Sequence, residues 1–391
     1  MNERVYLDWN ATAPLRQEAR AAMAAALDLT GNASSVHAEG RAARHVIEKA
    51  REQVARLVGA EAKNVTFTSG ATEANILALT PAIEIGGAKA LRDKLFISAI
   101  EHPSARSGGR FAADATEELQ VTGDGVVDLH ALRSVLARAE HPLVSVMLAN
   151  NETGVVQPIR EIAKILHAAK GMLHVDAVQG PGRIDCDIGD LGADLMSLSA
   201  HKLGGPQGAG ALIRRGHIHI AEPLIKGGGQ ERGLRAGTEN VAAIAGFGAA
   251  AAAAGRQADA DRMATLRDRI EAAIKAAVPD AVIFGETVQR LPNTTLFAVP
   301  GMKAETAIIA FDLNGIAVSS GSACSSGKVQ ASHVLAAMGV EPILAQGAVR
   351  LSLGWSTNER DLEKLLAALT KVSSSLLKKH ENSRLNSGLA A

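Results

Sequence analysis

Short apolar runs alternate with stretches of helical periodicity from the N-terminus through residue 215. The runs with the length and apolar content of buried strands are Asn64–Phe67, Leu95–Ser98, Pro142–Leu148, Met172–Val175 and Asp194–Leu198. Strands that alternate with helices are typical of crossover units around a parallel sheet. The pattern therefore predicts an α/β fold in which helices flank a mostly parallel sheet.

The C-terminal part of the chain shows the same alternation on a smaller scale. Thr238–Ala254 has a helical pattern, and a long charged helix is predicted over Asp259–Ala277. The apolar positions that give this second helix one face to pack are Met263, Leu266, Ile270 and Ile274. The later elements are strands at Val282–Phe284, Thr294–Val299 and Gly347–Leu353, and helices at Lys303–Leu313 and from Glu359 to Leu377.

The length of the chain favours two domains. It has 391 residues, of which 47% are hydrophobic, and single cores stop growing at roughly 250–300 residues. We therefore expect a large domain over residues 16–255. A smaller α/β domain would join residues 1–15 to residues 256–391.

The charge balance and cysteine content exclude several classes of function. Basic and acidic residues number 41 each and aromatics make up 3%. The chain therefore has neither the excess positive charge that binds phosphate backbones nor the aromatic residues on which bases stack, and nucleic-acid binding is not expected. The N-terminus lacks an apolar signal core, and the longest apolar stretch, Val241–Ala254, is shorter than the roughly 18 residues of a membrane span. We expect a soluble, cytoplasmic protein. Two cysteines, Cys186 and Cys324, are too few for a disulfide framework or a cysteine-based zinc site, and no metal site is predicted.

Lys202 and Asp176 carry the most informative chemistry. Each follows a predicted strand, and ligands of parallel α/β sheets collect beyond the carboxyl ends of the strands. An amine that forms an imine and a carboxylate that holds a ring nitrogen are what pyridoxal phosphate requires. The alternative is a solvated lysine and an aspartate that caps a helix, and from these two residues alone the two interpretations are about equally supported.

Other polar residues follow the same set of strands. Thr68–Ala74 places glycine and hydroxyls where a strand leads into a helix, which suits a phosphate group. His102 follows Leu95–Ser98 and could stack on a ring and move protons, and Asn151 and Gln179 could bond a ring hydroxyl. Each also has an ordinary explanation, namely an N-terminal helix cap, a solvated loop histidine and turn residues.

Taken together, these motifs resemble the pyridoxal-phosphate cysteine desulfurases of the NifS/IscS type, which have the fold-type I, aspartate aminotransferase-like architecture. The resemblance runs in order along nearly the whole chain. It is carried by Tyr6–Asp8, Asn10–Thr12, Asn32–His37, Thr68–Ala74, Glu101–His102, Asn150–Gly154, Gln157–Pro158, His174–Gln179, Ser199–Lys202, Gly204–Pro206, Gly227–Glu231, Arg235, Gly237–Thr238 and Ser319–Ser326. It implies a large domain with a mostly parallel seven-stranded sheet and a smaller α/β domain.

The resemblance assigns roles around the cofactor. It implies that Lys202 forms the imine with pyridoxal 5'-phosphate and that Asp176 faces the ring nitrogen. His102 would stack on the ring, while Asn151 and Gln179 would address its hydroxyl. The phosphate would be held by Ala71, Thr72, Ser199 and His201 of one subunit and by the partner subunit's Thr238, which implies a homodimer with its sites at the interface.

The segment Ser319–Gly327 is the feature that distinguishes a desulfurase from other fold-type I enzymes. It is rich in glycine and serine and is expected to be a mobile loop that carries Cys324 in the smaller domain. Cys186, between Ile184 and Ile188, is expected to be a buried structural thiol. By resemblance, Cys324 attacks the sulfur of L-cysteine and holds it as a persulfide, and alanine is released. Cys324 could also serve as a transient ligand of an iron–sulfur cluster.

The remaining implied roles concern the substrate and the acceptor. Arg350 would bind the carboxylate of L-cysteine with help from Asn10, Lys202 would remove the Cα proton, and His102 would handle the proton at the thiol. Without the resemblance, Arg350 would be explained as a rim salt bridge. The sulfur would pass to an iron–sulfur scaffold or another sulfur carrier.

Some positions depart from the family pattern, and three other functions stay open. Trp9 and Ala13 replace the residues usual there, which affects the expected shape of the substrate entrance, and residues 378–391 do not resemble the tail with which IscS-type members dock their scaffold. An aminotransferase or a selenocysteine lyase would share the cofactor residues without depending on Cys324. A sulfur-assembly scaffold without cofactor is the non-enzymatic alternative.

Overall fold

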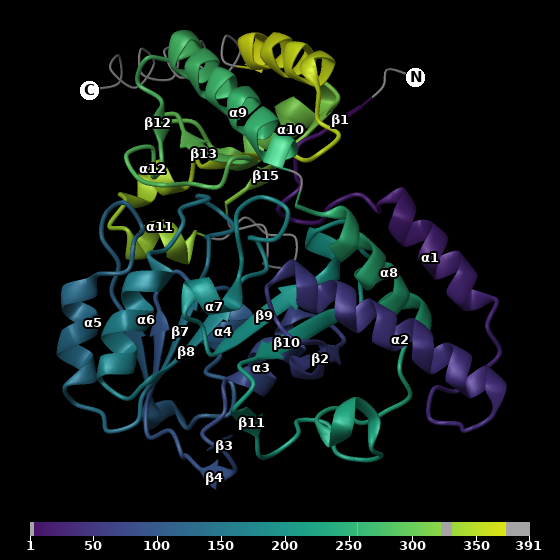
Figure 1. The fold of residues 1–391 in the computed structure, drawn as a ribbon. Coiled ribbons are helices and arrows are strands. Elements are labelled where there is room, and N and C mark those ends of the chain that lie inside the picture. The colour runs from purple at the N-terminus through teal and green to yellow at the C-terminus, as the bar shows by residue number, and fades with distance from the viewer. Residues whose placement is uncertain (1–3, 256, 322–330, 373–391) are drawn as a thin grey trace, which may run out of the picture.

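The computed structural model describes residues 4–255, 257–321 and 331–372 (Figure 1). Its centre is a seven-stranded sheet. In spatial order the strands are β2 (Val65–Thr68), β10 (Gly210–Arg214), β9 (Leu195–Ser199), β8 (Met172–Asp176), β7 (Leu143–Met147), β5 (Leu95–Ser98) and β6 (Thr116–Leu119). The predicted α/β class and the mostly parallel sheet are confirmed.

One strand of this sheet, β10, runs against its neighbours. It pairs antiparallel with both β2 and β9, whereas the pairs from β9 through β8, β7 and β5 to β6 are parallel. The connection from β9 to β10 spans residues 200–209, and a parallel partner would need a crossover of roughly a dozen residues or more. The short connection therefore returns the chain as a neighbouring antiparallel strand, and it contains the 3-10 turn η3 (Ala200–Lys202).

Alternate residues of the strands face two different helical layers. Phe96 of β5 packs in one core with α2 (Ala38–Leu57), α5 (Leu129–Leu136), α6 (Ile159–Ala168) and α8 (Val241–Ala253). Leu95 and Ile97, its neighbours in the strand, pack in another core with α3 (Ala71–Ala78) and α4 (Pro103–Arg106). This alternation follows from the two-residue period of a strand that is covered on both faces. Further elements of this part are α1 (Gln17–Leu27), α7 (Ile188–Leu191) and a small sheet of β11 (Ile218–Ile220), β3 (Ile83–Ile85) and β4 (Ala88–Lys89).

A second group of elements packs around its own core above the large sheet (Figure 1). The predicted charged helix is α9 (Gln257–Ala277), and its apolar face is buried at Met263, Leu266, Ile270 and Ile274 as expected. A four-stranded antiparallel sheet has the order β12 (Val282–Ile283), β13 (Thr294–Ala298), β16 (Val349–Ser352) and β15 (Ser319–Ser320). The other elements of this group are α10 (Ala304–Leu313), β14 (Ile316–Ala317) and a helix over residues 359–372. The short helices α11 (His333–Ala337) and α12 (Pro342–Ala345) pack in a further core with Leu296 of β13 and Met147 of β7.

The N-terminal strand β1 (Val5–Tyr6) joins this second group. It pairs in parallel with β14, and Val5 and Leu7 are buried in the same core as α9. The chain then crosses to the large sheet, where Ala13 bonds to the backbone of His201. The predicted domain boundary at residue 255 falls between α8 and α9, and the division into two domains stays a prediction. Among the described helices, none combines the length and apolar character that a bilayer span requires.

Candidate active site

A cavity of about 650 Å³ opens at the carboxyl ends of the parallel strands. Its volume lies in the range of small-molecule sites, about 300–1,000 Å³. The predicted site residues that line it are Asn10, Ala71, Thr72, His102, Asn151, Asp176, Gln179, Ser199, His201, Lys202 and Arg350. The fold thus brings side chains from both groups of elements to one place, as expected where a parallel sheet ends.

Lys202 lies at the end of the short turn that follows β9. Its Nζ donates to the backbone oxygen of Asn10 at 2.5 Å and to that of Ala11 at 2.9 Å. These bonds join the N-terminal segment to the floor of the cavity. The amine therefore sits where a bound aldehyde could reach it, held in place by carbonyl groups.

Asp176 is the last residue of β8 and is 5% exposed. Its Oδ2 accepts from Asn75 Nδ2 at 2.9 Å, and its Oδ1 accepts from the backbone N–H of Val178 at 3.1 Å. Asn75 Nδ2 also donates to Ser104 Oγ at 2.9 Å. The carboxylate is thus oriented by Asn75, a residue of α3 that sequence reasoning missed although it directly follows the Thr68–Ala74 motif.

His102 caps α4 and faces the cavity. Its Nδ1 lies 2.8 Å from Ser104 Oγ and accepts from the backbone N–H of Ser104 at 3.2 Å. Burial lowers the pKa of His102, the negative charge of Asp176 opposes that shift, and the positive charge of Lys202 adds to it. The imidazole is therefore favoured in its neutral form, which can accept a proton.

Glu101, the residue before His102, is a second buried acid that the sequence reasoning did not single out as a site residue. It is 0% exposed, and its Oε1 accepts from the backbone N–H of Met147 at 2.5 Å. Its pKa is raised well above the ordinary value, first by burial and then by the negative charge of Asp176. This shift favours the neutral form of Glu101, so the second acid adds less negative charge beside Asp176.

The start of α3 can accept an anion. Its N-cap residue is Gly70, no side chain caps its first amides, and the carboxylate of Glu73 is engaged by the backbone N–H of Ser69 and by Arg235. The alternative explanation of Thr68–Ala74, an N-terminal helix cap by a side chain, is therefore wrong for the described residues. Uncapped amides and the helix dipole favour a phosphate at this point.

His201 and Ser199 complete this end of the cavity. His201 Nδ1 lies 3.2 Å from Thr12 Oγ1, and burial together with the positive charge of Lys202 lowers its pKa to about 4. Ser199 ends β9 and is 4% exposed. These hydrogen-bonding groups thus line the same cavity as the uncapped helix start.

Arg350 lines the opposite side and is almost fully buried, at 2% exposure. Its Nη2 pairs with Asp8 Oδ1 at 2.7 Å, its Nη1 donates to the backbone oxygen of Asn151 at 2.9 Å, and its Nε has no hydrogen-bond partner within the described chain. Arg350 is therefore not a rim residue, although it does form a salt bridge. Asp8 is a partner that the sequence reasoning did not identify.

Asn10 has its side chain committed to neighbouring residues. Its Nδ2 donates to Thr294 Oγ1 at 2.9 Å, and its Oδ1 accepts from Asn293 Nδ2 at 3.1 Å. Its backbone oxygen accepts hydrogen bonds from Lys202 Nζ and from Gln179 Nε2. These contacts favour Asn10 as a structural junction between the two groups of elements, and its assistance at a substrate carboxylate stays a prediction.

Two predicted residues are not in this cavity, for different reasons. Thr238 is exposed and is not among the described residues that line it, which is compatible with a contribution to a partner's site. Cys324 lies outside the described residues. Trp9, expected near the substrate entrance, is instead 3% exposed and packs edge-on against Trp355 at 4.6 Å between ring centroids.

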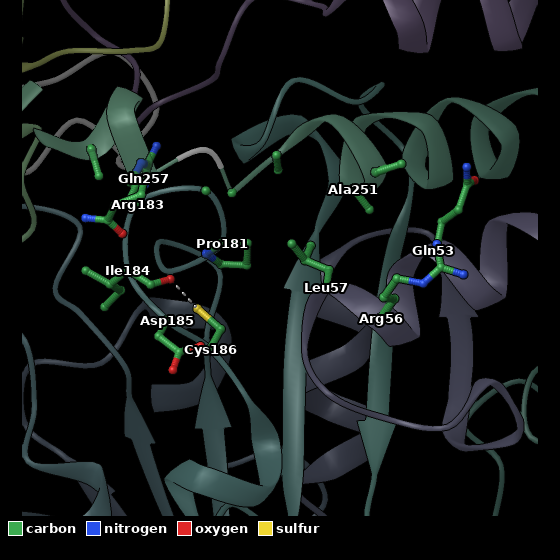
Figure 2. Close-up of a pocket in the computed structure, with 15 residues that line it drawn as sticks. Gln53, Arg56, Leu57, Pro181, Arg183, Ile184, Asp185, Cys186, Ala251 and Gln257 are labelled. Atoms are coloured by element: carbon green, nitrogen blue, oxygen red, sulfur yellow. Dashed lines mark hydrogen bonds between the residues drawn. The ribbon is translucent and has the colours of Figure 1, made fainter. Parts of the chain in front are cut away.

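Cys186 is buried, as the sequence predicted. Figure 2 shows it at the wall of a second hollow of about 500 Å³, with its Sγ directed at the backbone oxygen of Ile184, 3.2 Å away. Burial is the main cause of the raised pKa of this thiol, and the charge of Asp185 adds to it. A thiol kept protonated is a poor nucleophile, which indicates a structural role.

These observations fit an aromatic aldehyde that carries a phosphate group. An amine, a buried carboxylate and an uncapped helix start converge on one cavity of suitable volume. The chemistry of this set of residues is that of a pyridoxal phosphate site.

Known proteins give an independent view of the chain. The aminotransferase class-V family matches residues 5–365. A cysteine desulfurase of Cereibacter sphaeroides is 41% identical over 376 residues, which cover 95% of this chain and 96% of the relative. A cysteine desulfurase IscS of Dictyoglomus turgidum is 41% identical over 383 residues, with 95% of each chain covered. The crystal structure of a NifS-like protein from Rickettsia africae has a TM-score of 0.85 at 37% identity and covers 95% of this chain and 100% of its own.

Proposed function

This chain belongs to the aminotransferase class-V family, and we propose that it is a pyridoxal-phosphate-dependent cysteine desulfurase that converts L-cysteine to L-alanine. The observation that carries the proposal is the convergence of Lys202, Asp176 and the uncapped start of α3 on one cavity. Similarity at 41% identity over most of the chain to proteins with this activity favours it over an aminotransferase or a selenocysteine lyase.

The residues proposed to hold the cofactor line one cavity. Lys202 would bond its aldehyde, Asp176 would face its ring nitrogen, and His102 would lie against the ring. Asn151 and Gln179 would address the ring hydroxyl. The phosphate would bind at Ala71, Thr72, Ser199 and His201. When bound, the cofactor withdraws electrons from the amino acid and makes its Cα proton acidic.

The other residues bind the substrate and move protons. Arg350 would bind the substrate carboxylate, because a guanidinium can bond both carboxylate oxygens. Lys202 would take the Cα proton once its amine is released. Asp8 holds Arg350 through an ion pair of 2.7 Å and so orients the guanidinium. His102, favoured in its neutral form, can accept the proton of a thiol.

We assign the sulfur-accepting step to Cys324. Its thiolate would attack the sulfur of the substrate, so that an S–S bond forms and the substrate's Cβ–S bond breaks. The electron pair of the broken bond stays with Cβ, which takes up a proton to give alanine. Cys186 is a poor candidate for the same step, because it is buried and its pKa is raised.

The partners follow from the same proposal. We propose a homodimer in which the partner subunit's Thr238 completes the phosphate site, supported by the exposure of Thr238 in the single chain. The sulfur acceptor would be an iron–sulfur scaffold or another sulfur carrier. A cytoplasmic location stays a prediction.

Mass spectrometry of the protein after incubation with L-cysteine tests the activity and the nucleophile together. We expect alanine, sulfide in the presence of a reductant, and a gain of one sulfur atom on the peptide that contains Cys324. A C324A variant should lose sulfide production, whereas C186A should keep it. A keto acid as product would indicate transamination. Failure of borohydride to fix a yellow cofactor onto Lys202 would contradict the assignment of the lysine.

A further inference from the structure

Arg183 lies directly behind the cofactor side of the cavity and has no role in the chemistry above. Its Nη1 donates to the backbone oxygen of Gln179 at 3.0 Å and also to Gln179 Oε1. Its Nη2 lies 3.5 Å from the backbone oxygen of Lys202. One guanidinium thus contacts the residue proposed for the ring hydroxyl and the residue proposed for the aldehyde.

These contacts determine which atom Gln179 presents to the cavity. A guanidinium can only donate, so the side-chain atom that it contacts must be the amide oxygen. The backbone oxygen of Asn10 can only accept, so the atom of Gln179 that lies 3.1 Å from it must be the amide nitrogen. The nitrogen carries two hydrogens, and Gln179 lines the cavity, so its second hydrogen is the one available there.

Arg183 also places a positive charge at this point. Within the described residues, no carboxylate forms an ion pair with it, and its recorded partners are oxygens of Gln179 and Lys202. Burial, and next the positive charge of Arg350, lower the pKa of Arg183 to about 10, which leaves it protonated at neutral pH. Figure 2 shows the side chain at the edge of the second hollow, on the side away from Arg56.

We propose that Arg183 is a positioning residue that locks Gln179 as a hydrogen-bond donor and, with its charge, holds the ring oxygen of the bound cofactor in the ionised form. The inference rests on the proposed function and extends it to a residue outside the cavity lining. A neutral hydroxyl could accept the amide hydrogen of Gln179 as well, but Gln179 offers no acceptor for the hydroxyl's own proton in this arrangement. An ionised oxygen accepts the amide hydrogen and is stabilised by the charge behind it.

The test is the pH dependence of the absorbance of the bound cofactor, measured without substrate. A nearby fixed positive charge disfavours the more protonated form, so its removal should move the midpoint to higher pH. We expect R183M to raise the midpoint by about one unit, the lower end of the shifts that a close charge produces. R56M is the matched control, because Arg56 lines the same hollow and is exposed, and it should leave the midpoint unchanged.

Other titratable groups line the same cavity, and neither variant replaces any of them. They are Asp176 from β8, His102 from α4, His201 and Lys202 from η3, and Arg350 from β16. Cys186 lies beside Arg183 but has a raised pKa and is expected to remain neutral. A difference between R183M and R56M therefore reports on Arg183 itself.

A cofactor-loaded R183M with the wild-type midpoint would overturn the inference. If R183M does not retain cofactor, R183Q provides the second test, since it keeps a donor for Gln179 Oε1 and removes the charge. R183Q should also show a raised midpoint, and an unchanged one would refute the role of the charge. Wild-type protein that binds cofactor but makes no alanine from L-cysteine would instead contradict the proposed function, so the two failures can be told apart.

Discussion

Replacement of Asn75 by alanine tests how the buried acid of the site is held. The change removes the donor to Asp176 Oδ2 and to Ser104 Oγ, each at 2.9 Å, at a position that is 0% exposed. A hydrogen bond to a charged group contributes about 1.5–3 kcal/mol and a neutral one about 0.5–1.5 kcal/mol. Asn75 Oδ1 itself is buried without a partner in the described structure, and its removal relieves part of that loss. We expect the free energy of unfolding to fall by about 2–3 kcal/mol, the net of these contributions.

Urea unfolding of the cofactor-free protein measures this loss. N314A is the control, because the side-chain amide of Asn314 also donates a hydrogen bond, here to the backbone oxygen of Ala310 at 2.9 Å, but Asn314 is exposed. It should cost less than about 0.5 kcal/mol, as is usual for surface substitutions. If Asn75 acts through Asp176, the N75A and D176N changes should also be non-additive by more than about 0.5 kcal/mol. An N75A variant as stable as N314A, or an additive pair, would refute the assigned contact.

Three further predictions concern residues in or near the same site. The pKa of Glu101 is raised in the folded protein, so its contribution to stability is complete below the unfolded-state pKa and is lost as the pH rises through the folded-state pKa. The melting temperature of E101Q should therefore rise relative to that of wild type as the pH increases. Melting temperatures of the two proteins that change in parallel with pH would contradict the burial argument. A Cβ at Gly210 would lie 2.5 Å from the backbone at the start of α3, so G210A should lose about 1–3 kcal/mol of stability in urea unfolding and bind cofactor more weakly in equilibrium dialysis. G229A is the control, because a Cβ there would meet no described atom within 4 Å, and it should change neither stability nor cofactor binding. C186A should keep sulfide production while C324A loses it, and equal losses in a sulfide assay would argue against a structural role for Cys186.

The strands and the positions of the site residues along them were predictable from local patterns. Runs such as Leu95–Ser98 and Met172–Val175 are mostly apolar because both faces of a central strand are covered, and this leaves a signal within a few residues. Polar residues such as His102 and Lys202 stand out because they follow such runs, where the strands of a parallel sheet end together. The motif content then indicated the family, because its motifs occur in order along nearly the whole chain.

The partners of those residues depended on the tertiary structure. Asp8 and Arg350 form an ion pair across 342 positions of sequence, and Asn75 reaches Asp176 across 101. No local periodicity encodes such pairs, since they depend on which elements the chain brings to one sheet edge and on placements of a few tenths of an ångström. The direction of β10 and the donor that Gln179 presents were decided in the same way. Sequence therefore determined which chemical groups the site contains, whereas folding determined their charges, orientations and hydrogen-bond partners, because these depend on burial and on contacts between distant segments.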